Sequence, residues 1–66
     1  MKDRLKELRK ALHLTQQKLA DKLGVKQNTI AQYEMGRNEP SDAVIVSICR
    51  EFGVSEDWLR NGNGDM

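Results

Sequence analysis

The stretch from Leu14 to Gly36 most restricts what this 66-residue chain can fold into. Before Gly24, apolar side chains recur at spacings of one and four residues, as they do on one side of an α-helix. After it the helical spacing resumes, in Thr29, Ile30 and Tyr33. Glycine adopts the positive φ that closes a helix at little cost, so Gly24 separates two segments. The stretch predicts two short helices joined by a tight turn, the second over about residues 27–35.

The outer side of this second helix carries polar side chains that its own packing does not require. At about 100° per residue, the side opposite the apolar stripe is uncharged and rich in amides. Its members are Gln27, Asn28, Ala31, Gln32 and Met35. A solvated helix face is one interpretation of such a stripe. Met35 favours contact with another molecule, because an exposed thioether is costly unless it touches something.

Apolar residues at helical spacing predict three further helices and no strand. Leu5, Leu8 and Leu12 form the buried stripe of a helix over 2–12. Ser41 caps a fourth helix, and Ser55 caps a short fifth one. The fourth helix has the most hydrophobic face in the chain, so we expect that face at the centre of the core. Its members are Val44, Ile45, Ile48, Cys49 and Phe52.

These segments predict an all-α fold. Residues 1–60 are expected to form a single domain, with Trp58 and Leu59 folding back onto its core. Residues 61–66 are rich in glycine and asparagine, and we interpret them as a flexible tail or the start of a linker.

The length and the single cysteine limit how this domain is held together. Sixty-six residues are near the lower limit at which a hydrophobic core folds unaided. Cys49 cannot form an internal disulfide, which favours a reducing compartment. Because Cys49 lies in an apolar stripe, a role as a small buried hydrophobe is favoured over redox or catalytic chemistry. His13 is far from it in sequence, and no ligand cluster predicts a metal site.

The sequence also lacks the patterns of a membrane span, a signal peptide and an active site. No apolar run approaches the roughly 18 residues that a span needs. The N-terminus alternates charged residues with leucine, so we expect a cytoplasmic protein. His13 has no serine or cysteine at a recognisable catalytic spacing, and no glycine-rich phosphate loop is present. We therefore expect neither an enzyme nor a cofactor.

The formal net charge of +1 conceals two oppositely charged halves. Residues 1–37 hold nine Lys and Arg against four Asp and Glu, which gives +5. Residues 38–66 hold two basic residues against six acidic ones, which gives −4. Ordinary solvated helix faces are one interpretation of this division. Since the amide-rich helix lies in the positive half, we expect a polyanion to approach that half.

The polyanion that fits this pattern is double-stranded DNA. Two helices joined by a turn with glycine are the architecture that lays its second helix in a major groove. Amide side chains can pair with the N6/N7 edge of adenine, and Ala31 or Met35 can meet a thymine methyl group. The candidate phosphate contacts flank the reading helix on both sides in sequence. They are Gln16, Gln17, Lys18, Arg37 and Asn38.

The run LTQQKLADKLGVKQNTIAQYEMGRNEPS resembles the helix-turn-helix of the phage repressor and Cro-type (XRE-like) family. The likeness extends from Arg9 and the following Leu14-Thr15-Gln16 to the closing Phe52-Gly53-Val54-Ser55-x-x-Trp58-Leu59. It implies a compact five-helix, lambda-repressor-like DNA-binding domain of a transcriptional regulator, which we expect to be a repressor. Because one such domain reads only a few base pairs, we expect a homodimer on a two-fold symmetric operator.

The resemblance also implies roles for individual residues. Gln16 corresponds to the glutamine that contacts a phosphate at the start of the family's second helix. The base-reading positions correspond to Lys26, Gln27, Asn28 and Gln32. An ion pair from Arg9 to Glu34 is implied as well.

Two further expectations concern protein partners. The dimer surface is expected near the end of the less basic half, at Val54, Trp58 and Leu59. The alternative function is that of an antitoxin or another helical interaction module whose main partner is a protein.

Overall fold

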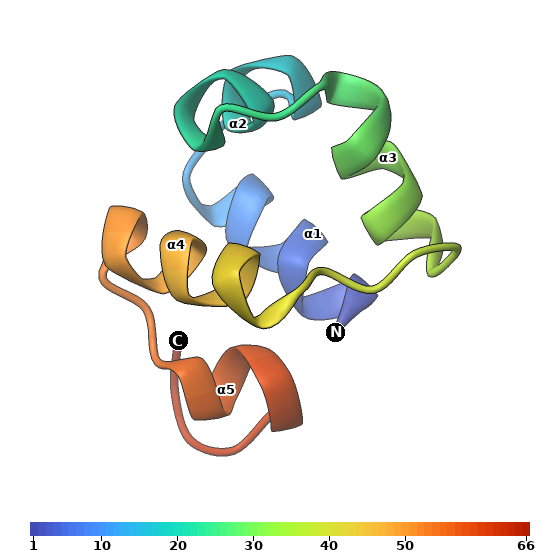
Figure 1. Ribbon diagram of the computed structural model, residues 1–66. Helices are drawn as coiled ribbons and strands as arrows, with labels where there is room; N and C mark the ends of the chain where they lie inside the picture. The colour runs from blue at the N-terminus through green and yellow to red at the C-terminus, as the bar shows by residue number, and fades with distance from the viewer.

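The computed structural model describes residues 1–66 as five helices without strands. The helices are α1 (Lys2–Ala11), α2 (Gln16–Leu23), α3 (Gln27–Met35), α4 (Asp42–Phe52) and α5 (Glu56–Asn61). Helix α1 lies in the middle of the molecule, with α2 above it, α3 to one side and α5 below in the view of Figure 1. The predicted all-α fold is confirmed. None of the five helices has both the length and the apolar content that crossing a bilayer requires.

Local chemistry sets where these helices begin and end. Three of them begin at a hydroxyl side chain that accepts a hydrogen bond from the backbone N–H three residues later, at 3.1 to 3.3 Å. These residues are Thr15, Ser41 and Ser55. Lys26 precedes α3 without a side-chain hydrogen bond to its N-terminus, as its side chain predicts. Gly24 and Gly36 end α2 and α3 with φ of 72° and 75°. This left-handed conformation lets the chain leave each helix in a tight turn.

The core draws on all five helices. Its fully buried large side chains are Leu5, Leu8, Leu19, Ile30, Ile48 and Leu59. Two of them come from α1, which packs against α3 and passes through the middle of the fold (Figure 1). Of the α4 stripe predicted at the centre of the core, Ile45 and Ile48 are buried there, and the other three residues are not. Val44, Cys49 and Phe52 of that stripe are only half-buried, because α4 packs at the side, against α2 and α5.

Leu12 lies outside the core, contrary to the stripe predicted from its spacing. Helix α1 ends at Ala11, and the chain then turns sharply at His13, which has a φ of 57°. The turn leaves Leu12 38% exposed, and Leu14 packs against the core instead. Leu12 is exposed because α1 ends before it, although its spacing continues the apolar stripe of the helix.

The C-terminal part of the chain folds onto α1 and α5. Arg4 of α1 donates from Nε to the Leu59 carbonyl at 2.9 Å and from Nη2 to the Arg60 carbonyl at 2.8 Å. The Ser55 N–H donates to the Met66 carbonyl at 3.0 Å, and Met66 packs against the core. The two bonds from Arg4 fix α5 against the start of α1, and the contacts of Met66 hold the end of the chain against the domain.

The expected dimer surface is wrong for two of its three residues. Trp58 and Leu59 are 7% and 0% exposed, because α5 turns them into the core of the monomer. The prediction that these two side chains fold back onto the core is confirmed. Only Val54 remains partly exposed.

Leu8→Ala should lower the free energy of unfolding by about 2–5 kcal/mol, because it removes a fully buried side chain and leaves a cavity. Leu12→Ala, one turn further along the chain, should lower it by about 1 kcal/mol or less, since that side chain is already largely in water. Urea unfolding followed by circular dichroism compares the two variants. Equal losses would contradict the difference in burial.

Candidate nucleic-acid interface

The outer face of α3 presents the predicted base-reading residues. Lys26, Gln27 and Asn28 are exposed at the start of the helix, and Gln32 is half-buried one turn further on. Met35 ends the same face and is 54% exposed, more than any other large apolar side chain. The side chains opposite this face, Ile30 and Tyr33, are buried in the core. The outer face of α3 is therefore accessible to a partner along the whole helix.

An ion pair between α1 and α3 holds this helix in place. Arg9 donates from Nε to Glu34 Oε2 at 2.7 Å and from Nη2 to Glu34 Oε1 at 3.2 Å. The Glu34 side chain is 2% exposed and that of Arg9 is 16% exposed. Two parallel hydrogen bonds between guanidinium and carboxylate fix both distance and orientation. Because Arg9 also donates from Nη1 to the Leu14 carbonyl at 3.0 Å, one side chain joins α1, α3 and the turn before α2.

Gln16 extends this contact to the exposed face. Its Nε2 donates to Glu34 Oε1 at 3.1 Å, and its Oε1 accepts a hydrogen bond from Gln27 Nε2 at 3.3 Å. The structure thus brings the predicted phosphate contact Gln16 next to the predicted base-reading residue Gln27. The sequence does not predict this contact, because the two amides belong to different helices and no periodicity relates them.

A second pair of predicted site residues also meets. Asn38 Nδ2 donates to Gln32 Oε1, so a residue of the loop after α3 contacts a residue on its outer face. The other predicted phosphate contacts remain separate. Gln17 donates to Asp21 Oδ1 at 2.8 Å within α2, and Lys18 and Arg37 are exposed on different segments. Each of the two outer-face glutamines is therefore held by an amide from a neighbouring segment.

A hollow of about 250 Å³ lies between α1 and α3, beside the outer face. It is lined by Lys6, Arg9, Lys10, Gln16, Ala31, Glu34 and Met35. The predicted site residues do not include Lys6 and Lys10. Their i, i+4 spacing was visible in the sequence, but it does not tell which element that side of α1 faces.

The acidic side chains, His13 and Cys49 are the other candidate reactive groups. No group of three or more His, Cys, Asp or Glu is placed to hold a metal ion. Burial raises the pKa of the Cys49 thiol, and the Glu56 carboxylate adds to that shift. A thiol with a raised pKa forms little of the nucleophilic thiolate, which agrees with a packing role for Cys49 in α4.

Comparison with known proteins agrees with this geometry. Residues 5–59 match the family model described as Helix-turn-helix. The chain is 38% identical over 63 residues to the uncharacterized HTH-type transcriptional regulator YqaE of Bacillus subtilis, covering 96% of this chain and 54% of YqaE. It is also 38% identical over 66 residues to the regulator YgzD of the same organism, covering 96% of this chain and 100% of YgzD. A third relative, the antitoxin PezA of Streptococcus pneumoniae, is 39% identical over 51 residues, 77% of this chain and 32% of PezA. The chain thus spans about half the length of YqaE and the whole of YgzD.

Glu34→Ala should lower the free energy of unfolding by about 3–5 kcal/mol, because it leaves the Arg9 guanidinium without its partner at a largely buried position. A double-mutant cycle with Arg9→Ala should give a coupling of about 1–3 kcal/mol between the two side chains. Chemical unfolding of the four proteins measures it.

The pair Arg60 and Glu56 serves as the matched control. It joins the same two residue types at 3.0 Å, but on the exposed side of α5. Its coupling in the corresponding cycle should be clearly smaller, since solvent screens exposed pairs. A coupling at Arg9 and Glu34 that is no larger than this one would contradict a structural role for the buried pair.

Proposed function

Because this chain belongs to the helix-turn-helix family of transcriptional regulators, we propose that it is a sequence-specific repressor whose α3 reads the major groove of duplex DNA. One observation carries the proposal. A continuous series of hydrogen bonds runs from Arg9 through Glu34 and Gln16 to Gln27 on the exposed face of α3. A side chain that is already oriented loses less conformational freedom on binding, and so it discriminates more sharply.

Base reading is assigned to the start of α3. In helix-turn-helix proteins the N-terminal residues of the recognition helix contact base edges. Gln27 and Asn28 can pair with the N6/N7 edge of adenine, and Lys26 can donate to guanine. Gln32, held by Asn38, reaches the next part of the groove. Met35 supplies an apolar contact at the end of the same face.

Phosphate contacts are assigned to the segments on either side of this face. Gln16, Gln17 and Lys18 open α2, where free backbone N–H groups and the helix dipole favour a phosphate. Arg37 and Asn38 follow α3 and add a cation and an amide. These contacts fix the register of the domain on the duplex without reading sequence.

The proposed assembly is a homodimer on a two-fold symmetric operator. One small domain contacts too few base pairs for useful specificity, and two domains one helical turn apart, at about 34–36 Å, double the reading surface. Such a repressor acts in the cytoplasm.

A protein-binding function remains the second candidate, because the chain is similar to the antitoxin PezA. The two functions differ in how binding depends on salt. Operator binding should weaken steeply as salt rises, with a slope of about −0.9 per phosphate contacted. Binding to a protein partner should depend far less on salt and show no preferred duplex.

Selection of bound sequences from a random duplex pool, followed by binding at several salt concentrations, tests the proposed function. We expect an enriched, two-fold symmetric sequence and an affinity that falls linearly on a log–log plot against salt. A folded protein that enriches no sequence would contradict sequence-specific recognition.

Gln27→Ala should relax base preference at one position of each half-site, at a cost of about 1–3 kcal/mol on the selected duplex. Gln17→Ala is the matched control, because Gln17 bonds only to Asp21 on its own helix. It should weaken all duplexes equally and leave the selected sequence unchanged. If Gln27→Ala left the selection unchanged, the assignment of the reading residue would be wrong.

A further inference from the structure

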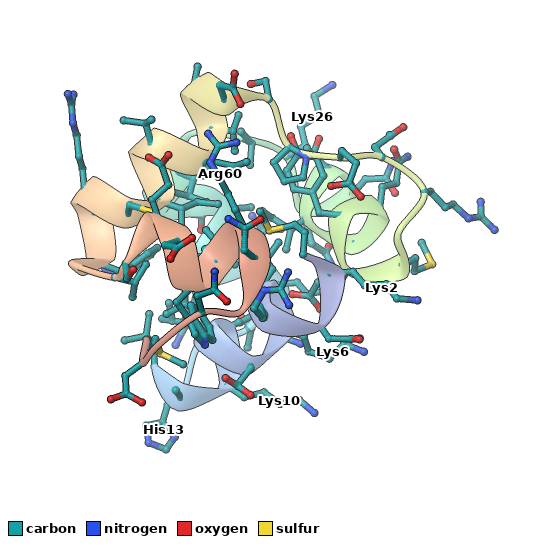
Figure 2. The ribbon with its side chains drawn as sticks, turned by 90° about the horizontal axis from the view of Figure 1, so that it is seen from below. Lys2, Lys6, Lys10, His13, Lys26 and Arg60 are labelled. Atoms are coloured by element: carbon teal, nitrogen blue, oxygen red, sulfur yellow. The ribbon has the colours of Figure 1, made fainter.

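Three lysines of α1 form a row on one exposed side of the helix. Lys2, Lys6 and Lys10 follow one another at intervals of four residues, so each step along the helix is about 6 Å. Figure 2 shows them along one edge of the molecule, on the side where α3 lies. At one end of the row, Lys2 packs against Gly36, where an added Cβ would lie 3.0 Å from Lys2 Cδ. The row therefore starts beside the C-terminal end of α3.

The charge of this lysine row is not balanced by ion pairs. The basic side chains that do form ion pairs are Arg9 and Arg60. Asp3 and Glu7 belong to the same helix, but neither forms an ion pair with a lysine of the row. The three ammonium groups are thus free to attract an anion.

The row borders the outer face of α3 directly. Lys6 and Lys10 line one side of the hollow that Ala31 and Met35 line on the other. Three cationic side chains and one carboxylate surround the hollow, a net of +2, and Glu34 is already neutralised by Arg9. The phosphates of a duplex docked on α3 would lie close to these positive side chains.

The loop after α3 cannot supply the same attraction. Arg37 is followed by Glu39, so the segment 37–39 carries no net charge. Arg37 and Asn38 can contact a phosphate, but the loop adds no net positive charge. Helix α1 offers a further source of attraction on this side of α3.

We propose that Lys2, Lys6 and Lys10 form a second phosphate-binding surface, which holds the DNA strand that passes the C-terminal half of α3. The inference rests on the proposed function, because it assumes that duplex DNA lies against α3. It adds α1 to the interface as an element that binds without reading bases.

The test uses the double variant Lys6→Gln/Lys10→Gln on two duplexes of equal length, one selected from a random pool and one nonspecific. Glutamine and lysine have similar helix propensities, so α1 should stay folded, which circular dichroism checks. The salt slope should be smaller by about 0.9 per lysine removed, or about 1.8 in total. Between 50 and 200 mM salt the variant should therefore lose roughly tenfold less affinity than the wild type. Its selected sequence should not change.

Lys22→Gln/Arg50→Gln is the matched control. It removes the same charge from two exposed side chains at the ends of α2 and α4, neither of which forms an ion pair or lines the hollow. Its slope should equal that of the wild type. If both double variants reduced the slope equally, the effect would be one of net charge and the proposed surface would be wrong.

The two duplexes separate this inference from the proposed function. An unchanged slope for Lys6→Gln/Lys10→Gln on the selected duplex would overturn the phosphate surface and leave sequence-specific recognition standing. Suppose that no sequence is enriched, but that the salt slope of Lys6→Gln/Lys10→Gln on the nonspecific duplex is still smaller by about 1.8. That result would support the phosphate surface and contradict sequence-specific recognition.

Discussion

The fold depends on a carboxylate that is almost completely withdrawn from water. Glu34 has 2% of its side chain exposed, and an unpaired charge at such depth would cost several kcal/mol. It is stable there because Arg9 and Gln16 supply three hydrogen bonds to its two oxygens. Arg9 belongs to α1 and Gln16 to α2, so satisfying the charge on α3 fixes the three helices relative to one another. In a chain of 66 residues, whose apolar core is small, such a polar contact defines the geometry that aliphatic packing alone leaves loose.

The same contact also restricts side chains on the outer face of α3. Glu34 sits at the border between the buried and the exposed side of this helix, and Gln16 links it to Gln27. On the other side Asn38 holds Gln32. Amide side chains on a helix surface ordinarily sample several rotamers, and each one immobilised on binding costs free energy. Here neighbouring segments have already restricted the two glutamines, so the fold pre-orients the face to which we assign base reading.

The sequence predicts the helices well because their boundaries are local. Thr15, Ser41 and Ser55 each precede an apolar stripe and cap the helix that follows. Gly24 ends α2 because it adopts the left-handed conformation that the turn needs. The sequence fails where a turn or a packing partner decides. Leu12 continues the period of α1 but lies beyond its end, where the turn at His13 leaves it exposed. Contacts such as that of Gln16 with Gln27 lie between segments, and no spacing along one helix encodes them.

The folded structure also sharpens the division of charge that the sequence shows. In the second half Arg60 bonds to Asp42 at 2.9 Å and to Glu56 at 3.0 Å, and the bond to Asp42 is the main cause that raises its pKa. That cation therefore satisfies acids of its own half. In the first half Glu34 forms an ion pair with one cation, Arg9, and the lysines of α1 form none. Ion pairing thus leaves unpaired positive charge on the side of α3, around a reading face that is itself uncharged between Gln27 and Gln32. In the complex that we propose, different residues attract phosphate and discriminate between bases, so a change in one set alters affinity without altering the sequence that is read.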